Sequence, residues 1–239
     1  VTKRALVRFA THAEELGFDG VGFTDHPAPS HRWLTHGGHD ALDPFVAFGV
    51  VAAVTERICL VPNILVLPYR NPFVVAKAAA ALDVLSDGRF VLAVATGYQR
   101  GEYRALGVDF EERNRLFDEA LAVIKGVWST DDFAYEGLHF TATGQTANPK
   151  PGNVPIWIGG NSARSRRRVA TSGDGWTPFA APATLARTAK TPVLESVDDL
   201  VPMLDHLWRC VDEARRDPRD IDVSVQALGC APPGHEAFD

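Results

Sequence analysis

The sequence predicts an α/β fold built on a parallel β-sheet. Apolar stretches suited to strands alternate with helical patterns, and these stretches are residues 20–25, 58–66, 90–96, 155–159, 175–179 and 221–227. Alternation at this spacing indicates repeated strand–helix units. The clearest unit covers residues 57–98, and its two strands are apolar on both faces, as in sheets covered by helices. In such folds the chemistry lies at the carboxyl ends of the strands.

Within this unit, local signals mark where each element begins and ends. Asn71 is suited to cap a helix, and Pro72 suits the first turn, where a missing N–H costs nothing. We therefore expect a helix from Phe73 to about Leu85. The irregular Pro62-Asn63 step interrupts the first strand, and the second strand stops at Thr96-Gly97-Tyr98.

The other elements follow in order. Helical spacing of apolar residues predicts helices over 3–16, 44–54, 110–128, 163–172 and 198–215, with Ser196 or Asp198 as the cap of the last. Residues 28–42 and 180–197 are expected to be loops. Residues 129–153 interrupt the rhythm, with a hairpin-like segment at 135–140 and a Pro/Gly linker at 148–154.

Composition narrows the class of protein. The chain has 239 residues, of which 46% are hydrophobic, and this supports one large α/β domain. A formal net charge of -6 without a basic stripe argues against nucleic acid as a partner. No apolar run reaches the length of a membrane span, and the N-terminus has no secretory signal pattern. We expect a cytoplasmic protein.

Asp25 and His26 close the first predicted strand, at the active edge of the sheet. A histidine there can donate a proton or stabilise a developing negative charge, because its pKa lies near neutrality. The alternative is a histidine that binds a loop carbonyl.

The nearby His31, His36 and His39 match no compact metal-ligand spacing, so we predict a solvated substrate loop and no metal.

Gly159-Gly160-Asn161-Ser162 follows another predicted strand. Two glycines let the backbone approach a ligand, and Asn161 or Ser162 can cap a helix whose free N–H groups face an anion. This arrangement suits a cofactor phosphate, although an ordinary strand–helix turn has the same pattern.

Thr96 and Gly97 end another predicted strand, at the same edge of the sheet. The arginines of the next helix, 164 and 166–168, are predicted to form a solvated face.

Several stretches together resemble the luciferase-like monooxygenase superfamily, and within it the coenzyme F420-dependent oxidoreductases. These stretches are residues 14–19, 24–26, 55–58, 65–72, 79–90, 106–113, 156–162 and 173–176. The most specific are Leu-Pro-Tyr-Arg-Asn-Pro at 67–72 and Leu-Asp-Val-Leu-Ser-Asp-Gly-Arg at 82–89. There is no Gly-x-Gly-x-x-Gly, P-loop or Gly-x-Ser-x-Gly motif, which counts against a Rossmann dehydrogenase, an NTPase and an α/β-hydrolase.

The resemblance implies one TIM-type (β/α)8 barrel domain over residues 1–239, with excursions at 129–153 and 180–197. It implies hydride transfer between coenzyme F420 and an organic substrate, with His26 at the reactive face of the ring and Asp25 orienting it or meeting the cofactor. It also maps a non-proline cis peptide to Asn63-Ile64. The cofactor-binding set is Asn63, Ile64, Thr96, Gly97, Tyr98, Gly159, Gly160, Asn161 and Ser162.

Two other interpretations stay open. One is a monooxygenase of the same superfamily that uses FMN, since the two classes share this scaffold. The other is a non-catalytic remnant, because the first strand and the last barrel elements of the family are not found in the sequence. An incomplete barrel would expose sheet edges, and a homodimer would cover them.

Overall fold

A computed structural model describes residues 1–225 of the chain. The fold consists of two compact units, one over Val1–Pro155 and one beginning at Ile156. Helices alternate with parallel strands in both units, which confirms the α/β class. The last predicted strand, residues 221–227, extends beyond the described residues.

The first unit contains six α-helices and six strands among its described elements. The helices are α1 (Lys3–Glu15), α2 (His31–Leu34), α3 (Pro44–Ala52), α4 (Pro72–Leu85), α5 (Arg100–Ala105) and α6 (Arg113–Ser129). The strands are β1 (Gly20–Val21), β2 (Cys59–Leu60), β3 (Leu65–Val66), β4 (Leu92–Ala95), β5 (Phe133–Glu136) and β6 (Thr141–Gln145). Strand β1 pairs in parallel with β2, and β3 pairs in parallel with β4.

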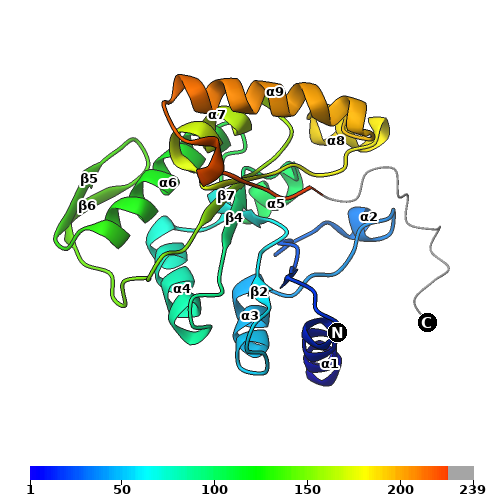
Figure 1. Ribbon diagram of the computed structural model, residues 1–239, viewed down its shortest axis with the longest axis horizontal. Coiled ribbons are helices and arrows are strands. Elements are labelled where there is room, and N and C mark those ends of the chain that lie inside the picture. Colours follow the sequence, from blue (N-terminus) through cyan, green and yellow to red (C-terminus); the bar gives the residue numbers. More distant parts are fainter. Residues whose placement is uncertain (226–239) are drawn as a thin grey trace. The chain divides into compact units, whose positions relative to one another are not determined.

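The second unit continues the strand–helix rhythm. Its elements are β7 (Ile156–Gly159), α7 (Ala163–Ser172), β8 (Gly175–Thr177), α8 (Ala183–Ala189), α9 (Val197–Glu213) and β9 (Asp222–Val223). Strand β8 lies between β7 and β9, and both pairings are parallel. Helix α9 packs along α7 (Figure 1). A capping box at Ser196 and Asp199 begins α9, as one of the two predicted caps.

The unit at residues 57–98 has the predicted form. Asn71 accepts a hydrogen bond from Phe73 N, and Pro72 is the first residue of α4. A cis peptide bond joins Asn63 to Ile64, as the resemblance implied, and it lies where the predicted strand 58–66 divides into β2 and β3. The core of this unit includes the fully buried Phe48 and Phe90.

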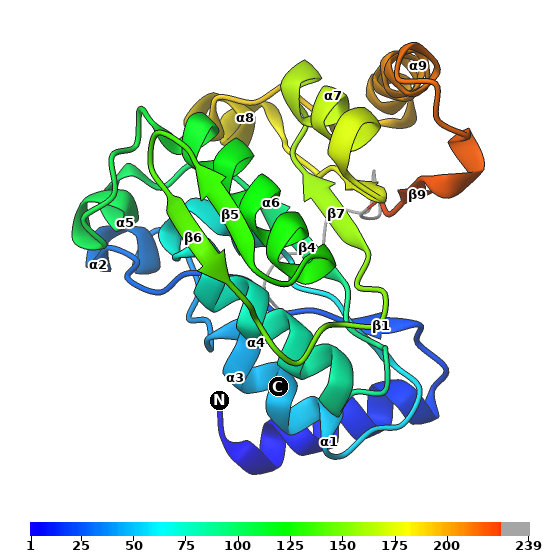
Figure 2. The same cartoon turned by 90° about the vertical axis from the view of Figure 1, so that its left-hand side faces the viewer.

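The excursion after α6 is a hairpin, as predicted. Strands β5 and β6 pair antiparallel beside α6 (Figure 2). Glu119 of α6 accepts hydrogen bonds from Leu138 N at 3.1 Å and His139 N at 2.9 Å, and so attaches the hairpin turn to the helix.

Two predicted loops contain helices. Segment 28–42 includes α2, whose first turn is capped by the Ser30 hydroxyl, and segment 180–197 includes α8. Both helices are short, with four and seven residues, so their apolar residues do not repeat often enough to show a helical period. Cys59, in β2, is half-buried.

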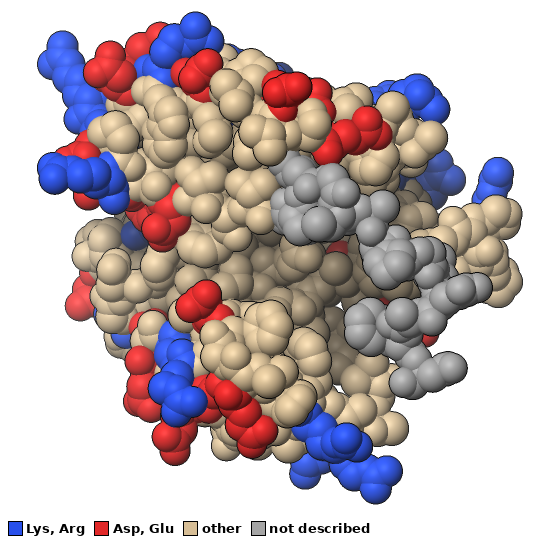
Figure 3. Space-filling model, turned by 45° about the vertical axis from the view of Figure 1, so that its right-hand side comes forward, with Lys and Arg blue, Asp and Glu red and all other residues tan. Residues whose placement is uncertain are grey.

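Charged side chains of both signs are interspersed on the face that Figure 3 presents, and neither sign forms a continuous stripe there. Within residues 1–225, every helix is too short or too polar to cross a membrane.

Glu14 joins the end of α1 to the segment that leads into β2. Its carboxylate accepts hydrogen bonds from three consecutive backbone N–H groups, at 3.1 Å from Glu56, 2.6 Å from Arg57 and 2.8 Å from Ile58. These bonds, the one from Arg57 first, lower the pKa of Glu14 from 4.5 to about 2. The carboxylate form is therefore favoured by folding.

This depressed pKa predicts a pH-dependent contribution to stability. The contribution is complete above pH 4.5, the unfolded pKa, and is lost as the pH falls to about 2. We expect Glu14→Gln to lower the melting temperature near neutrality. The melting temperature of this variant should also fall less than that of the wild type between pH 4.5 and about 2. Thermal unfolding at a series of pH values measures both effects. Glu15→Gln is the matched control, because that side chain is 72% exposed. An unchanged pH profile in Glu14→Gln would contradict the assignment.

Candidate functional site

The carboxyl ends of β1, β3 and β4 carry polar side chains that converge within the first unit. Asp25 and His26 follow β1, Arg70 follows β3, and Glu102 lies on α5 after β4. All four are joined in hydrogen-bonded pairs. The predicted active edge therefore brings Asp25 and His26 together with two residues that the motifs did not assign.

Asp25 is held by a bidentate ion pair. It is 3% exposed. Its carboxylate accepts hydrogen bonds from Arg70 Nη1 at 2.6 Å, Arg70 Nη2 at 2.9 Å and Val66 N at 2.9 Å. Arg70 also reaches Asp43, the cap of α3, at 2.9 Å. The hydrogen bonds described for the Asp25 carboxylate are therefore to Arg70 and to the backbone of β3, and none is to His26.

His26 is instead held by Glu102. The two side chains meet at 3.0 Å between Nδ1 and Oε2, and they are 11% and 1% exposed. Glu102 also accepts Ala28 N at 3.2 Å and the Tyr69 hydroxyl at 3.3 Å. Burial, followed by the charge of Glu102, raises the pKa of Tyr69, so the phenol stays a neutral donor. With Nδ1 committed to the carboxylate, Nε2 is the ring nitrogen that can serve a ligand.

The turn after β4 requires glycine. Gly97 has φ of +64°, and a Cβ there would lie 2.6 Å from Cγ1 of Val66. The neighbouring Thr96 carbonyl accepts the Tyr103 hydroxyl. Burial, followed by the charge of Glu102, raises the pKa of Tyr98. The predicted Thr96–Tyr98 segment therefore lies beside the His26–Glu102 pair.

Gln99, the next residue, carries a buried polar atom that lacks a partner. Its Nε2 is shielded from solvent and makes no hydrogen bond to any residue of the described part of the chain. Buried amides are normally satisfied. This donor suits a ligand with acceptor atoms at the carboxyl end of β4.

The glycine turn of the second unit is held by its own side chains. Gly160 has φ of +102°. Asn161 is fully buried, and its amide donates to Phe179 O at 3.0 Å and Pro192 O at 3.1 Å. Ser162 caps α7 and accepts Ser165 N at 3.1 Å, as predicted. Both side chains are engaged, and Gly160 N donates to Thr177 O at 3.3 Å, so the other backbone N–H groups of the turn are what it can offer to an anion.

The predicted solvated face of arginines is wrong for two of its members. Arg166 and Arg168 are 7% and 9% exposed. Arg166 donates from Nη1 to Asn161 O at 2.8 Å and from Nε to His206 Nδ1 at 3.2 Å. Because α9 covers this side of α7, Arg166 supports the glycine turn instead of facing solvent.

Glu102, like Arg70, is a site residue that sequence reasoning missed. It is noticeable in the sequence only as an acid in the loop after β4, and its partner His26 lies 76 positions away.

In residues 1–225, no cluster of three or more His, Cys, Asp or Glu side chains could hold a metal ion.

The Asp25–Arg70 pair predicts a large stability effect. We expect Arg70→Ala to lower the free energy of unfolding by about 3–5 kcal/mol, because it leaves a buried carboxylate without its cation. Arg115→Ala, at an arginine 68% exposed in its pair with Glu112, should change it by less than about 0.5 kcal/mol. Urea denaturation measures both, and equal effects would overturn the buried-pair interpretation.

Known proteins similar in sequence to this chain include F420-dependent dehydrogenases. An F420-dependent glucose-6-phosphate dehydrogenase from Microbacterium testaceum is 30% identical over 236 residues, which are 97% of this chain and 65% of the relative. One from Beutenbergia cavernae is 34% identical over 179 residues, which are 72% of this chain and 52% of the relative. This chain thus spans about half to two thirds of these relatives. They confirm the likeness to F420-dependent oxidoreductases.

Solved structures share the fold. Monooxygenase RslO1 from Streptomyces bottropensis has a TM-score of 0.77 at 22% identity and covers 92% of this chain, which covers 64% of it. An F420-dependent secondary alcohol dehydrogenase with an F420–acetone adduct has a TM-score of 0.76 at 22% identity, with 94% of this chain and 64% of that one covered. The luciferase-like monooxygenase profile matches residues 1–237. The chain therefore belongs to the luciferase-like monooxygenase family.

Proposed function

We propose that this chain is a coenzyme F420-dependent oxidoreductase that transfers a hydride between the coenzyme and a small organic alcohol or its carbonyl product. The buried His26–Glu102 pair is the observation that carries this proposal. The names of relatives support the cofactor and the alcohol class, since they include F420-dependent glucose-6-phosphate dehydrogenases and an F420-dependent secondary alcohol dehydrogenase.

The residues at the carboxyl end of β4 suit such a cofactor. Gly97, with φ of +64°, has no side chain to keep a ligand from the backbone after β4. The Gln99 Nε2 atom is a buried donor without a partner among residues 1–225. Within the first unit we assign contacts with the ring to Asn63 and Ile64, and contacts with the rest of the coenzyme to Thr96, Gly97 and Tyr98. The contacts expected of Gly159–Ser162 stay predictions. When bound, the deazaflavin supplies a two-electron acceptor for the hydride of the substrate.

The chain's own residues handle the proton. His26 Nε2 takes the proton of the substrate hydroxyl as its carbon loses a hydride, and a carbonyl results. Glu102 fixes the ring through Nδ1 and stabilises the imidazolium that forms, and Tyr69 and Ala28 N hold Glu102 in place. Asp25 takes no direct part in the proton transfer. Its carboxylate holds Arg70 and the backbone N–H of Val66 at the end of β3.

We also propose that residues 1–239 belong to one TIM-type barrel domain. The family match runs through both compact units without a break, which supports this view. The homodimer and the cytoplasmic location stay predictions.

Coenzyme binding tests the choice of cofactor. We expect coenzyme F420 to bind with micromolar affinity and FMN to bind more weakly, in parallel titrations followed by fluorescence. FMN is the relevant competitor, because solved neighbours include a Baeyer–Villiger monooxygenase from Pseudomonas putida in complex with FMN. Tight binding of FMN alone would replace F420 in the proposal. Binding of neither would favour a non-catalytic remnant.

Substitutions at the pair test the chemistry. We expect His26→Ala and Glu102→Gln each to reduce turnover of F420 by about 10²–10⁴, the usual value of a positioned acid–base group. Loss of F420 absorbance, with glucose 6-phosphate and propan-2-ol as trial substrates, measures the rates.

His12→Ala is the matched control, because that ring pairs with Glu15 on the surface and is 69% exposed. Thermal unfolding shows whether each variant is folded. Wild-type turnover in a folded His26→Ala would remove the role assigned to that residue.

A further inference from the structure

One carboxylate oxygen of Glu102 is shared by two donors. Its Oε2 atom lies 3.0 Å from His26 Nδ1 and accepts the Tyr69 hydroxyl at 3.3 Å. The other oxygen, Oε1, accepts Ala28 N at 3.2 Å. Because the Glu102 side chain is only 1% exposed, these neighbours and not bulk water determine how its negative charge is stabilised. The phenol and the imidazole therefore compete for the charge on the same oxygen.

The Tyr69 ring is held in one position by other aromatic rings. Tyr69 ends the short helical turn η1 (Leu67–Tyr69) and is buried. It packs edge-on against Tyr103, with ring centroids 4.8 Å apart and an interplanar angle of 71°. Tyr103 in turn packs edge-on against Phe110, at 5.1 Å between centroids. Since packed interiors leave little free volume, the phenol has little room to turn away from Glu102.

The far end of this row of rings is held by two arginines. The guanidinium carbons of Arg100 and Arg113 lie 4.1 Å and 3.9 Å from the centroid of the Phe110 ring, within the range of cation–π contacts. Arg100 is the first residue of α5, the helix that carries Glu102. The donor Tyr69 and the acceptor Glu102 therefore belong to one packed assembly within the first unit.

Tyr69 acts toward Glu102 as a neutral donor. Burial, followed by the charge of Glu102, raises the pKa of Tyr69. A hydrogen bond donated to a carboxylate favours the charged form of that carboxylate. The effect on His26 has the opposite sign, because charge on Oε2 that is stabilised by the phenol attracts the imidazolium less strongly.

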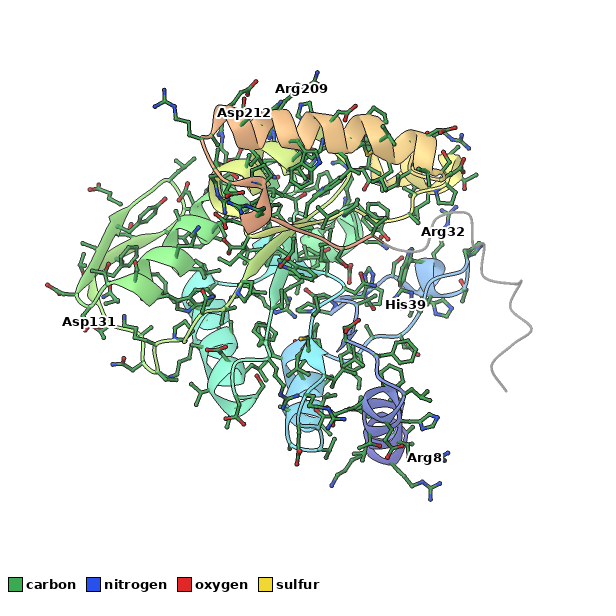
Figure 4. The ribbon with its side chains drawn as sticks, viewed as in Figure 1. Arg8, Arg32, His39, Asp131, Arg209 and Asp212 are labelled. Atoms are coloured by element: carbon green, nitrogen blue, oxygen red, sulfur yellow. The ribbon has the colours of Figure 1, made fainter. Side chains whose placement is uncertain are left out.

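Other titratable and charged groups face this pair from the elements around it. His39, labelled in Figure 4, is exposed, and its ring centroid lies 5.4 Å from that of His26. All of these groups stay in place when the hydroxyl of Tyr69 alone is removed, so the difference between variant and wild type measures the phenol. The remaining groups are Tyr98 after β4, Asp25 with its partner Arg70, Asp43 on Arg70, and Asp40 beside His39.

We propose that Tyr69 is a positioning residue that adjusts the His26–Glu102 pair to its role as a base. The phenol holds part of the charge on Oε2 and so weakens the attraction between the carboxylate and the imidazolium. His26 then releases its proton at a lower pH and is ready to accept one from the substrate. This assignment rests on the proposed function and adds the group that sets the pH range of activity.

NMR of the histidine rings tests this role without coenzyme or substrate. The rings are isotopically labelled, and the signal of His26 is the one that is missing from the spectrum of His26→Gln. We expect the titration midpoint of this signal in Tyr69→Phe to lie about 0.5–1 pH unit above the wild-type midpoint, which is about a three- to tenfold change in proton binding. The midpoint belongs to the coupled pair, since His26 and Glu102 share the charge.

Tyr103→Phe is the matched control. This substitution also removes one hydroxyl from the same row of rings, but that hydroxyl donates to Thr96 O and not to Glu102. It should leave the titration midpoint of His26 unchanged. Thermal unfolding checks that each variant is folded, and it also shows whether loss of either hydroxyl lowers stability without affecting the titration.

A second variant keeps the ring and strengthens the donor. Fluorotyrosine placed at position 69 has a more acidic phenol, which donates a stronger hydrogen bond to the carboxylate, so the midpoint should move to lower pH. In turnover of F420, the acid limb of the pH profile of kcat/KM should move in the same direction as the midpoint in each variant.

Each outcome decides the role of Tyr69. An unchanged or lowered midpoint in folded Tyr69→Phe overturns the proposal, and so does an equal shift in Tyr103→Phe. If Tyr69→Phe does not fold, a midpoint that fails to fall in the fluorotyrosine protein overturns it. If the wild type turns over F420 while the midpoint does not respond to Tyr69, only this inference fails. If the midpoint responds while the wild type neither binds nor turns over F420, the proposed function fails and the effect of Tyr69 on the pair stands.

Discussion

Two carboxylates that cannot reach water organise the first unit. A buried carboxylate must be paired and hydrogen-bonded, or it shifts its pKa and loses its charge. Asp25 meets this demand with Arg70 and a backbone N–H, and Glu102 meets it with His26, Tyr69 and another backbone N–H. Since these partners come from different strand ends, satisfying the two acids fixes the edge of the sheet where the chemistry is proposed. His26 is oriented by the same requirement that keeps Glu102 stable.

Much of the fold could be predicted because its signals are local. The cap at Asn71, the proline at the first turn of α4 and the cap at Ser162 each depend on neighbours within a few positions, and all three are found where expected. Helices α2 and α8 were missed for the opposite reason. Helix α2 begins at the Ser30 cap, α8 begins at Pro182 without a capping side chain from that residue, and both helices are too short to show a period.

The candidate site could be predicted only in part, because its pairs are distant in the sequence. Position at a strand end was enough to single out His26. Its partner Glu102 follows from tertiary structure, since the two residues are 76 positions apart. Arg166 was misjudged because burial depends on α9, which no pattern within α7 reveals. The resemblance located the cis peptide at Asn63-Ile64, which no residue pattern could have indicated.

Glu14 and Glu119 share a feature with a consequence for how the sequence can diverge. Each binds backbone N–H groups of a remote segment, not its side chains. Every residue except proline offers that group. The constraint that these contacts impose is therefore one-sided: the acid at one end must be kept, while at residues 56–58 and 138–139 the contacts themselves exclude only proline. Such contacts hold distant segments together and leave little trace of covariation between them.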